Sequence, residues 1–190
     1  FRSSLPAAEL LQVPGEKVKP LTEQVVEFIK LRFRNLLLDQ KLRYDVVDAA
    51  MADTRNTDLY DIAQRAQALQ GFVAEAKAAD SIQAATRVNN LSGKVEVEVP
   101  INETLFREEA ERALYAVVKK LDTELIAADT RCDYAGALAL LAELNGPVNR
   151  FFDDVMVMDK EESVKKNRLA LLSAVRDIMN NVGDLSKIVM

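Results

Sequence analysis

Three short clusters combine basic side chains with side-chain amides, and one of them adds aromatic rings. They are Arg87 with Asn89 and Asn90, the run Asn149-Arg150-Phe151-Phe152, and the run Lys165-Lys166-Asn167-Arg168. Basic side chains bind phosphates, amides hydrogen-bond to base edges and aromatic rings stack on bases, which is how unpaired RNA is recognised. The same residue types are common near helix ends, and adjacent phenylalanines are more often core residues. The clusters therefore indicate a candidate RNA-binding surface, with an ordinary helix surface as the alternative.

The sequence lacks the residues on which most catalytic sites depend. Its 190 residues include no histidine and a single cysteine, Cys132. This excludes histidine general-base catalysis, an internal disulfide and a multi-cysteine zinc site. A glycine-rich phosphate loop and a metal-ligand spacing are also absent from the sequence. The carboxylates that stand out are expected on polar helix faces: Glu108, Glu109, Glu111, Glu161 and Glu162. We therefore expect binding without catalysis, and no cofactor held by this chain.

The charge and hydropathy of the chain limit its partners. The formal net charge is −5, which counts against nucleic-acid binding but does not exclude a local basic patch. No apolar run is long enough to span a membrane and no signal peptide is visible. The first residue is Phe1, so we expect a fragment of a larger protein. The single cysteine is consistent with a reduced compartment, and we expect a cytoplasmic protein with no membrane partner.

The hydrophobic pattern predicts an all-α fold, a single bundle of about seven helices with short connections. Residues 1–20 are punctuated by prolines and are expected to be a linker or a remnant of an upstream domain, and residues 21–190 the helical domain. The expected helices are 21–40, 44–52, 59–77, 81–92, 103–128, 134–144 and 161–182, with an apolar segment at 148–158. Residues 94–99 alternate like a strand, but without an evident partner we expect an extended connection. Gly146 and Pro147 are expected to break the chain between helices.

The first and last helices carry the clearest patterns. The first is expected to bury Val25, Ile29, Phe33 and Leu36. Its interleaved basic residues form either a phosphate-facing patch or a solvated face: Lys30, Arg32 and Arg34, followed by Lys41 and Arg43.

The last helix has an apolar stripe at helical spacing: Val164, Leu171, Val175, Ile178 and Val182. Asn167 and Arg168 lie at the edge of this stripe. Because an unpaired buried arginine is costly, we expect the pair where the helix meets a partner or a cleft.

Several segments carry a family resemblance, and the most specific are "FFDDVMVM" (151–158) and "NRLALL" (167–172), followed by "GDLSKI". "VVEFIKLRFRNLL" and the stretch 74–94, "AEAKAADSIQAATRVNNLSGK", add to it, as does "INETLF" before a long helix. Over residues 22–188, in this order and spacing, the chain resembles the β subunit of the bacterial tetrameric glycyl-tRNA synthetases. The resembling part of that family is a C-terminal anticodon-binding domain of the DALR type, shared with arginyl-tRNA synthetases.

The resemblance implies a tRNA(Gly)-binding function. The domain would position tRNA(Gly) for ATP-dependent glycylation at a site in the α subunit of an α2β2 holoenzyme. ATP and Mg would be bound there, and DNA would not be a partner. By analogy with the arginyl enzymes, the anticodon loop would meet the helix around 83–90 and the start of the last helix. The implied RNA contacts are Gln83, Arg87, Asn90, Asn149, Arg150, Asn167 and Arg168. Their arginines would hold phosphates or guanine edges, and Asn90 and Asn167 would read bases.

Two alternatives stay open. A helical protein-interaction module would suit the acidic net charge, and the equivalent domain of an arginyl-type synthetase would share the fold. The "FFDDVMVM" segment favours the glycyl branch.

Overall fold

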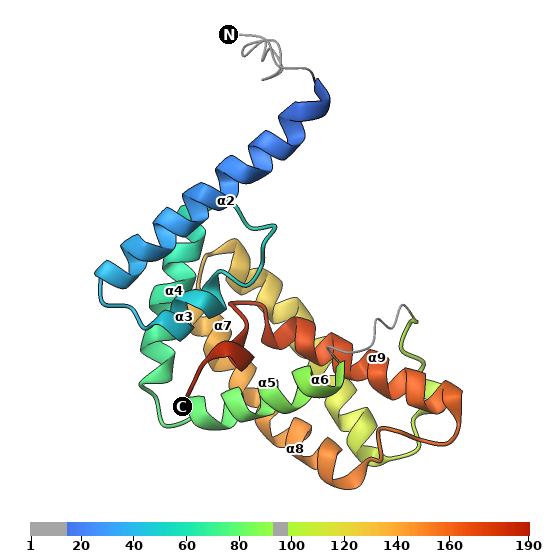
Figure 1. The fold of residues 1–190 in the computed structure, drawn as a ribbon. Coiled ribbons are helices and arrows are strands. Elements are labelled where there is room, and N and C mark those ends of the chain that lie inside the picture. The colour runs from blue at the N-terminus through green and yellow to red at the C-terminus, as the bar shows by residue number, and fades with distance from the viewer. Residues whose placement is uncertain (1–14, 93–98) are drawn as a thin grey trace.

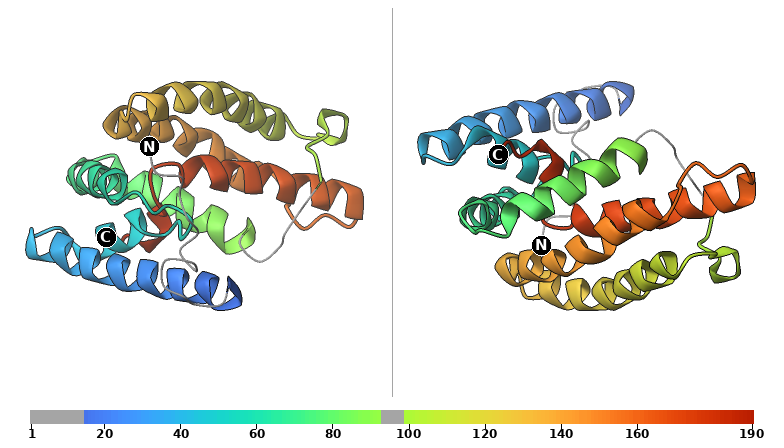
Figure 2. Two further views of the ribbon diagram at one scale, coloured as in Figure 1. Left: turned by 90° about the horizontal axis from the view of Figure 1, so that it is seen from above. Right: turned by 90° about the horizontal axis from the view of Figure 1, so that it is seen from below.

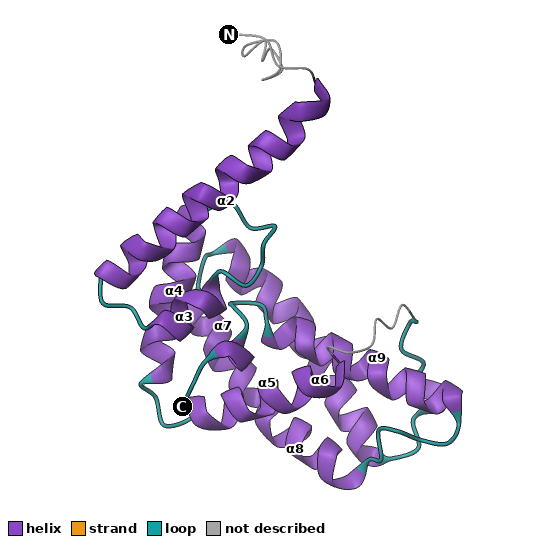
Figure 3. Ribbon diagram, viewed as in Figure 1, coloured by secondary structure: helices purple, strands orange, loops and turns teal. Residues whose placement is uncertain are grey.

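The computed structural model describes residues 15–92 and 99–190, which form α-helices joined by short connections (Figures 1 and 3). No strand occurs within these two ranges, so the all-α prediction is confirmed. The α-helices are α2 (Gly15–Asp39), α3 (Tyr44–Ala50), α4 (Leu59–Val73), α5 (Ala78–Ser92), α6 (Glu109–Thr130), α7 (Tyr134–Leu141), α8 (Asn145–Asp154) and α9 (Glu162–Met179). Three short 3-10 helices accompany them: η1 (Glu103–Leu105), η2 (Ala142–Leu144) and η3 (Leu185–Lys187). Of the expected extended connection at 94–99, residues 94–98 lie outside the described residues.

Helix α9 runs through the middle of the bundle. It packs against α5 on one side and against α6 on the other, as the two views of Figure 2 show. The apolar stripe expected on it is confirmed, because Val164, Leu171 and Val175 are buried together with Ile178 and Val182. Helix α8 lies beside α5 and α6, and η3 packs against α3 and α5. Helix α9 therefore lies between the α5 side and the α6 side of the bundle and joins them through the core.

The helix starts follow the capping residues. Asp58 caps α4 by accepting from the amides of Tyr60 and Asp61, and Asp133 caps α7, so both helices start at the expected residues. Helix α6 begins later than expected, at Glu109, because Glu108 and the N3 residue Glu111 form a capping box there.

The expected break at Gly146 and Pro147 is wrong. Both residues lie in the first turn of α8, which follows η2 without an intervening loop. Proline lacks only an amide hydrogen, and the first helical turn has no intrahelical acceptor for that hydrogen, so the turn tolerates it. Gly146 and Pro147 therefore mark the start of a helix and not a break between two helices.

Helix α2 differs from expectation at its start and in its faces. It begins at Gly15, upstream of Pro20, so part of the expected linker is helical. Phe33 packs against the core as expected, and Leu37 is buried. Val25, Ile29 and Leu36, expected to be buried, are instead exposed. The helix is apolar on two sides, and the bundle covers one of them.

Gly183 offers a test of how tightly the segment after α9 packs. A Cβ at this position would come within 2.9 Å of the carbonyl oxygen of Ala49 and of Cδ1 of Leu69. The backbone cannot shift easily, because the next amide, that of Asp184, donates to the same Ala49 oxygen at 3.0 Å. We expect Gly183→Ala to cost about 1–3 kcal/mol of unfolding free energy, measured by urea denaturation.

Gly71 supplies the matched control for that substitution. It lies inside α4, and a Cβ there would meet nothing within 4 Å. Gly71→Ala should therefore stabilise the chain by about 0.5–1 kcal/mol through helix propensity. Equal effects of the two substitutions would contradict the packing described for Gly183.

Candidate nucleic-acid interface

Helix α5 presents three of the predicted RNA-binding residues along one side. Gln83, Arg87 and Asn90 follow one another at spacings of four and three residues, which places them on one helix face. Gln83 and Asn90 are exposed and Arg87 is partly exposed, while Ala84 and Val88 on the opposite side enter the core. The amphipathic pattern of α5 thus turns these polar side chains outward.

Arg87 joins this face to helix α8. Its Nη1 donates to Oδ1 of Asn149 at 3.0 Å, and its guanidinium carbon lies 4.5 Å from the centre of the Phe152 ring. The second contact is a cation–π interaction, which holds the guanidinium plane over an aromatic face. Two clusters that lie 62 residues apart in the sequence are therefore in direct contact.

The two consecutive phenylalanines have different roles. Successive helix residues point about 100° apart, so Phe151 and Phe152 cannot both face the core. Phe151 is fully buried, and Phe152 is half-buried beneath Arg87. Their rings meet edge to face with centroids 5.8 Å apart. Phe152 belongs to the second sequence cluster but is not among the implied RNA contacts, although the helical spacing of the two rings indicates that one of them faces outward.

The remaining residues of α8 complete the surface. Asn149 and Arg150 are exposed, and Nε of Arg150 pairs with Asp154 one turn later at 3.3 Å. Such an exposed pair is weak and leaves the guanidinium available to a stronger anion. We call the following set the α5–α8 face: Gln83, Arg87, Asn90, Asn149, Arg150 and Phe152.

Buried and half-buried amides fix the two helices beneath this face. Nδ2 of Asn145, at the start of α8, donates to Oγ of Ser81 at 2.9 Å. Nδ2 of Asn89 donates to Oγ of Ser186 at 2.6 Å and to Asp184 at 3.3 Å. Asn89, which belonged to the first sequence cluster, is thus used to hold α5 against η3.

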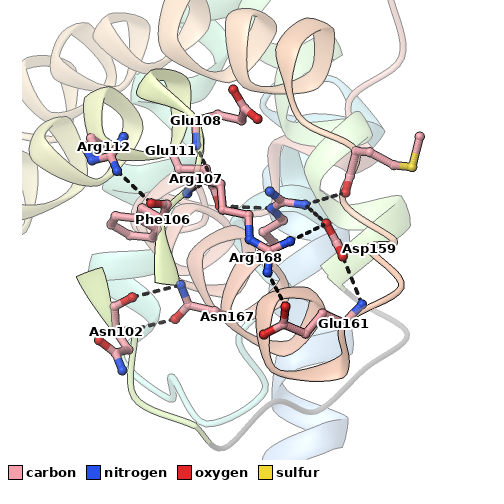
Figure 4. A network of polar contacts seen from close by, with 11 residues as sticks. Asn102, Phe106, Arg107, Glu108, Glu111, Arg112, Asp159, Glu161, Asn167 and Arg168 are labelled. Atoms are coloured by element: carbon pink, nitrogen blue, oxygen red, sulfur yellow. Dashed lines mark hydrogen bonds and ion pairs between the residues drawn. The ribbon is translucent and has the colours of Figure 1, made fainter. Parts of the chain in front are cut away.

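Two members of the third sequence cluster, Asn167 and Arg168, lie inside the protein, whereas Lys165 is half-buried and Lys166 is exposed. Arg168 and Glu111 have side-chain exposures of 3% and 0% and pair through Nε and Oε1 at 2.9 Å. Nη1 of Arg168 also donates to the carbonyl oxygen of Met156 and to Asp159, each at 2.9 Å (Figure 4). Arg168 therefore connects α9, the start of α6 and the loop that follows α8. The surface position expected for Glu111 is wrong, because its carboxylate is fully enclosed.

Hydrogen bonds keep both members of this buried pair charged. Burial alone would raise the pKa of Glu111, but Arg168 and the amides of Glu108 and Arg107 donate to its carboxylate and together lower that pKa. The two amides donate to Oε2 at 2.8 Å each. Burial would likewise lower the pKa of Arg168, yet Glu111 and Asp159 raise it. The pair is stable because nearly every charge-bearing atom has a partner.

Asn167 is buried beside Arg168 and closes a second connection. Its Oδ1 accepts from the amide of Asn102 at 2.7 Å, and its Nδ2 donates to the Asn102 carbonyl at 3.1 Å (Figure 4). Both polar groups are satisfied within the chain. The prediction that Asn167 and Arg168 touch RNA therefore does not fit their burial. Arg168 is paired, as a buried arginine must be, but with Glu111 and Asp159 of the same chain and not at a cleft or a binding partner.

Three of the five basic residues around α2 are also engaged within the protein, while Arg32 and Lys41 are exposed. Nζ of Lys30 donates to the carbonyl of Thr54 at 2.6 Å, and Arg34 pairs with Asp48 at 2.6 Å. Arg43 donates to Asp45 at 2.6 Å. These contacts favour the structural interpretation of this basic region over a phosphate-facing patch.

The described ranges 15–92 and 99–190 contain neither a membrane span nor a cluster of metal ligands. No helix there is long and apolar enough to cross a bilayer. Within the same ranges, no group of three or more histidine, cysteine or acidic side chains is arranged to hold a metal ion. The candidate site is thus the exposed α5–α8 face, supported from within by the Arg168 network.

An all-α bundle that presents arginines, amides and an aromatic ring on two adjoining helices has the makeup of a helical RNA-binding domain. Residues 81–190 match the sequence model of the DALR anticodon binding domain. Because this stretch is more than half of the chain and includes the whole α5–α8 face, the chain belongs to the DALR anticodon-binding domain family.

The names of similar proteins are more specific than the name of the family. A glycine–tRNA ligase beta subunit of Desulforudis audaxviator is 41% identical over 164 residues, which cover 86% of this chain and 24% of the relative. One from Shewanella halifaxensis is 39% identical over 183 residues, 94% of this chain and 26% of the relative. One from Clostridioides difficile is 38% identical over 169 residues, 89% of this chain and 24% of the relative. The resemblance to the β subunit is confirmed, and the chain spans about a quarter of the length of these relatives.

Removing the Arg168 side-chain charge tests the importance of the buried network. Arg168→Met would leave the Glu111 carboxylate buried without its cation, at a cost of about 3–5 kcal/mol in unfolding free energy. Urea denaturation followed by circular dichroism measures this cost. The control is Arg55→Met, which breaks a pair with Asp53 in which the arginine side chain is 90% exposed. That change should stay within about 0.5 kcal/mol. Similar costs for the two variants would contradict the assigned role of Arg168.

Proposed function

We propose that the α5–α8 face binds the anticodon loop of a tRNA. The observation that carries the proposal is the cluster of Arg87, Asn149 and Phe152, which joins a cation, an amide and an aromatic ring across two helices. All three residues lie within the part of the chain that matches the DALR anticodon binding domain. A surface that combines phosphate binding, hydrogen bonding and stacking suits the unpaired bases of an RNA loop.

Each residue type on the face has a role in this proposal. Arg87 and Arg150 bind loop phosphates, and the stack of Arg87 on Phe152 offers a flat surface on which a base can lie. The amides of Gln83, Asn90 and Asn149 can both donate and accept hydrogen bonds. A glycine anticodon ends in two cytosines, which carry an N4 donor and the acceptors O2 and N3. Side-chain amides can hydrogen-bond to the donor and to the acceptors.

We further propose that the chain is the anticodon-binding part of a glycine–tRNA ligase beta subunit. This rests on relatives that bear that name and that match 86–94% of the chain. The tRNA bound would then be tRNA(Gly), and glycylation would occur at a site in an α subunit, where ATP and Mg would be bound. The chain itself would position tRNA without catalysing a step. DNA and membranes are not partners in this account, and the enzyme would work in the cytoplasm.

The alternatives make different predictions for salt dependence and tRNA choice. An apolar protein-interaction surface would bind its partner with little dependence on salt, whereas RNA binding weakens as salt rises. The domain of an arginyl-type synthetase would prefer tRNA(Arg) in direct competition. The names of the relatives favour the glycyl assignment.

Binding of an anticodon stem-loop of tRNA(Gly) tests the proposed function, with a stem-loop altered at the second and third anticodon bases as its comparison. If Arg87 and Arg150 each neutralise one phosphate, log K should fall with log[salt] at a slope of about −1.4. Arg150→Gln should weaken both RNAs alike and reduce the slope by about 0.7. Phe152→Leu should weaken binding roughly tenfold through lost stacking and leave the slope unchanged.

The control for these variants is Arg131→Gln, which removes an exposed cation at the end of α6. It should leave affinity and slope unchanged. Equal binding of the two stem-loops, or equal effects of the Arg131 and Arg150 substitutions, would contradict anticodon recognition by the α5–α8 face.

A further inference from the structure

Helix α2 carries a second apolar side that nothing in the described chain covers. The helix packs against α3 and α4, with Phe33, Leu37 and Leu38 against the core, while its first half projects beyond the bundle (Figure 1). On the side away from the bundle lies a row of large apolar side chains, 41–58% exposed, that we call the outer stripe: Leu21, Val25, Phe28, Ile29 and Leu36.

The outer stripe has the spacing of a helix face that is built to be buried. Its members Leu21, Val25, Phe28 and Leu36 follow at intervals of four, three and eight residues, so they share one side of the helix. Arg32 lies between them, and its guanidinium carbon is 5.2 Å from the centre of the Phe28 ring. Scattered single apolar residues are normal on a surface, but a contiguous row marks an interaction site.

The size of the stripe argues against a second copy of the chain as its cover. Five half-exposed side chains amount to an apolar patch on the order of a few hundred Å². A stable interface between separate molecules buries about 800 Å² on each partner. A partner within the same polypeptide needs less area, because the covalent connection supplies an effective concentration in the millimolar range.

The length of the relatives leaves room for such a partner within the same polypeptide. The matched beta subunits are about four times as long as the part that this chain covers, since that part is 24–26% of each relative. A polypeptide of that length holds ample further sequence to pack against α2. We propose that the outer stripe docks on an apolar surface elsewhere in the same longer polypeptide, with an acidic group opposite Arg32. This inference rests on the proposed function only in taking the chain to be part of a polypeptide of that length.

Hydrogen exchange of α2 peptides tests the docking, in the natural full-length polypeptide and in the 190-residue chain. Docking should slow exchange across residues 21–36 in the full-length polypeptide by about tenfold or more relative to the chain. Phe28→Ser should abolish that protection. The control is Leu31→Ser, because Leu31 is 59% exposed on the same helix but lies off the stripe, and it should leave the protection intact.

Three results would overturn the docking. One is equal hydrogen exchange of α2 in the two proteins. A natural polypeptide no longer than this chain would give the same result. Another is equal effects of Phe28→Ser and Leu31→Ser. The third is protection in the 190-residue chain that grows with its concentration, since a second copy would then cover the stripe. Stem-loop binding by the Phe28→Ser chain should equal that of the unsubstituted chain. If α2 is protected in the full-length polypeptide but the chain does not bind RNA, only the proposed function is contradicted.

Discussion

The buried ion pair between Arg168 and Glu111 is the contact on which the arrangement of the bundle depends. It joins the first turn of α6 to the first half of α9, and the other arm of Arg168 holds the loop after α8 through Met156 and Asp159. A buried charge is costly unless it is paired and hydrogen-bonded, so this contact tolerates few other arrangements of these three elements. The loop after α8 is held by the same arginine, so the pair helps to fix α8 and with it half of the α5–α8 face.

The α5–α8 face consists of weaker and more adaptable contacts. Arg87 bonds to Asn149 and covers Phe152, and Arg150 has only an exposed partner. Contacts of this strength can be exchanged for contacts to RNA at little cost. The chain therefore separates two tasks: a largely satisfied interior network sets the geometry, and the face proposed to bind RNA is exposed with partly satisfied groups. An overall acidic chain can bind RNA in this way, because a local group of cations matters more than the sum.

The sequence predicted most of the helices, including the starts of α4 and α7, and the buried stripe of α9, since these depend on local chemistry and helical period. It also placed Arg87 and Asn149 in candidate clusters. It could not show that Arg168 is a core residue, because its partner Glu111 lies 57 positions away and looks like a surface carboxylate. Helix α2 is the reverse case. Its apolar spacing predicts that Val25, Ile29 and Leu36 are buried, but the described chain leaves these side chains exposed.

The most direct test of the account is amide chemical-shift mapping of the 190-residue chain on titration with the tRNA(Gly) anticodon stem-loop. The account predicts that the largest changes fall on residues 83–90 of α5 and 149–152 of α8. The amides of α2 and those around the buried Arg168 should change little. Changes centred on α2, or spread evenly over the surface, would contradict a binding site on the α5–α8 face.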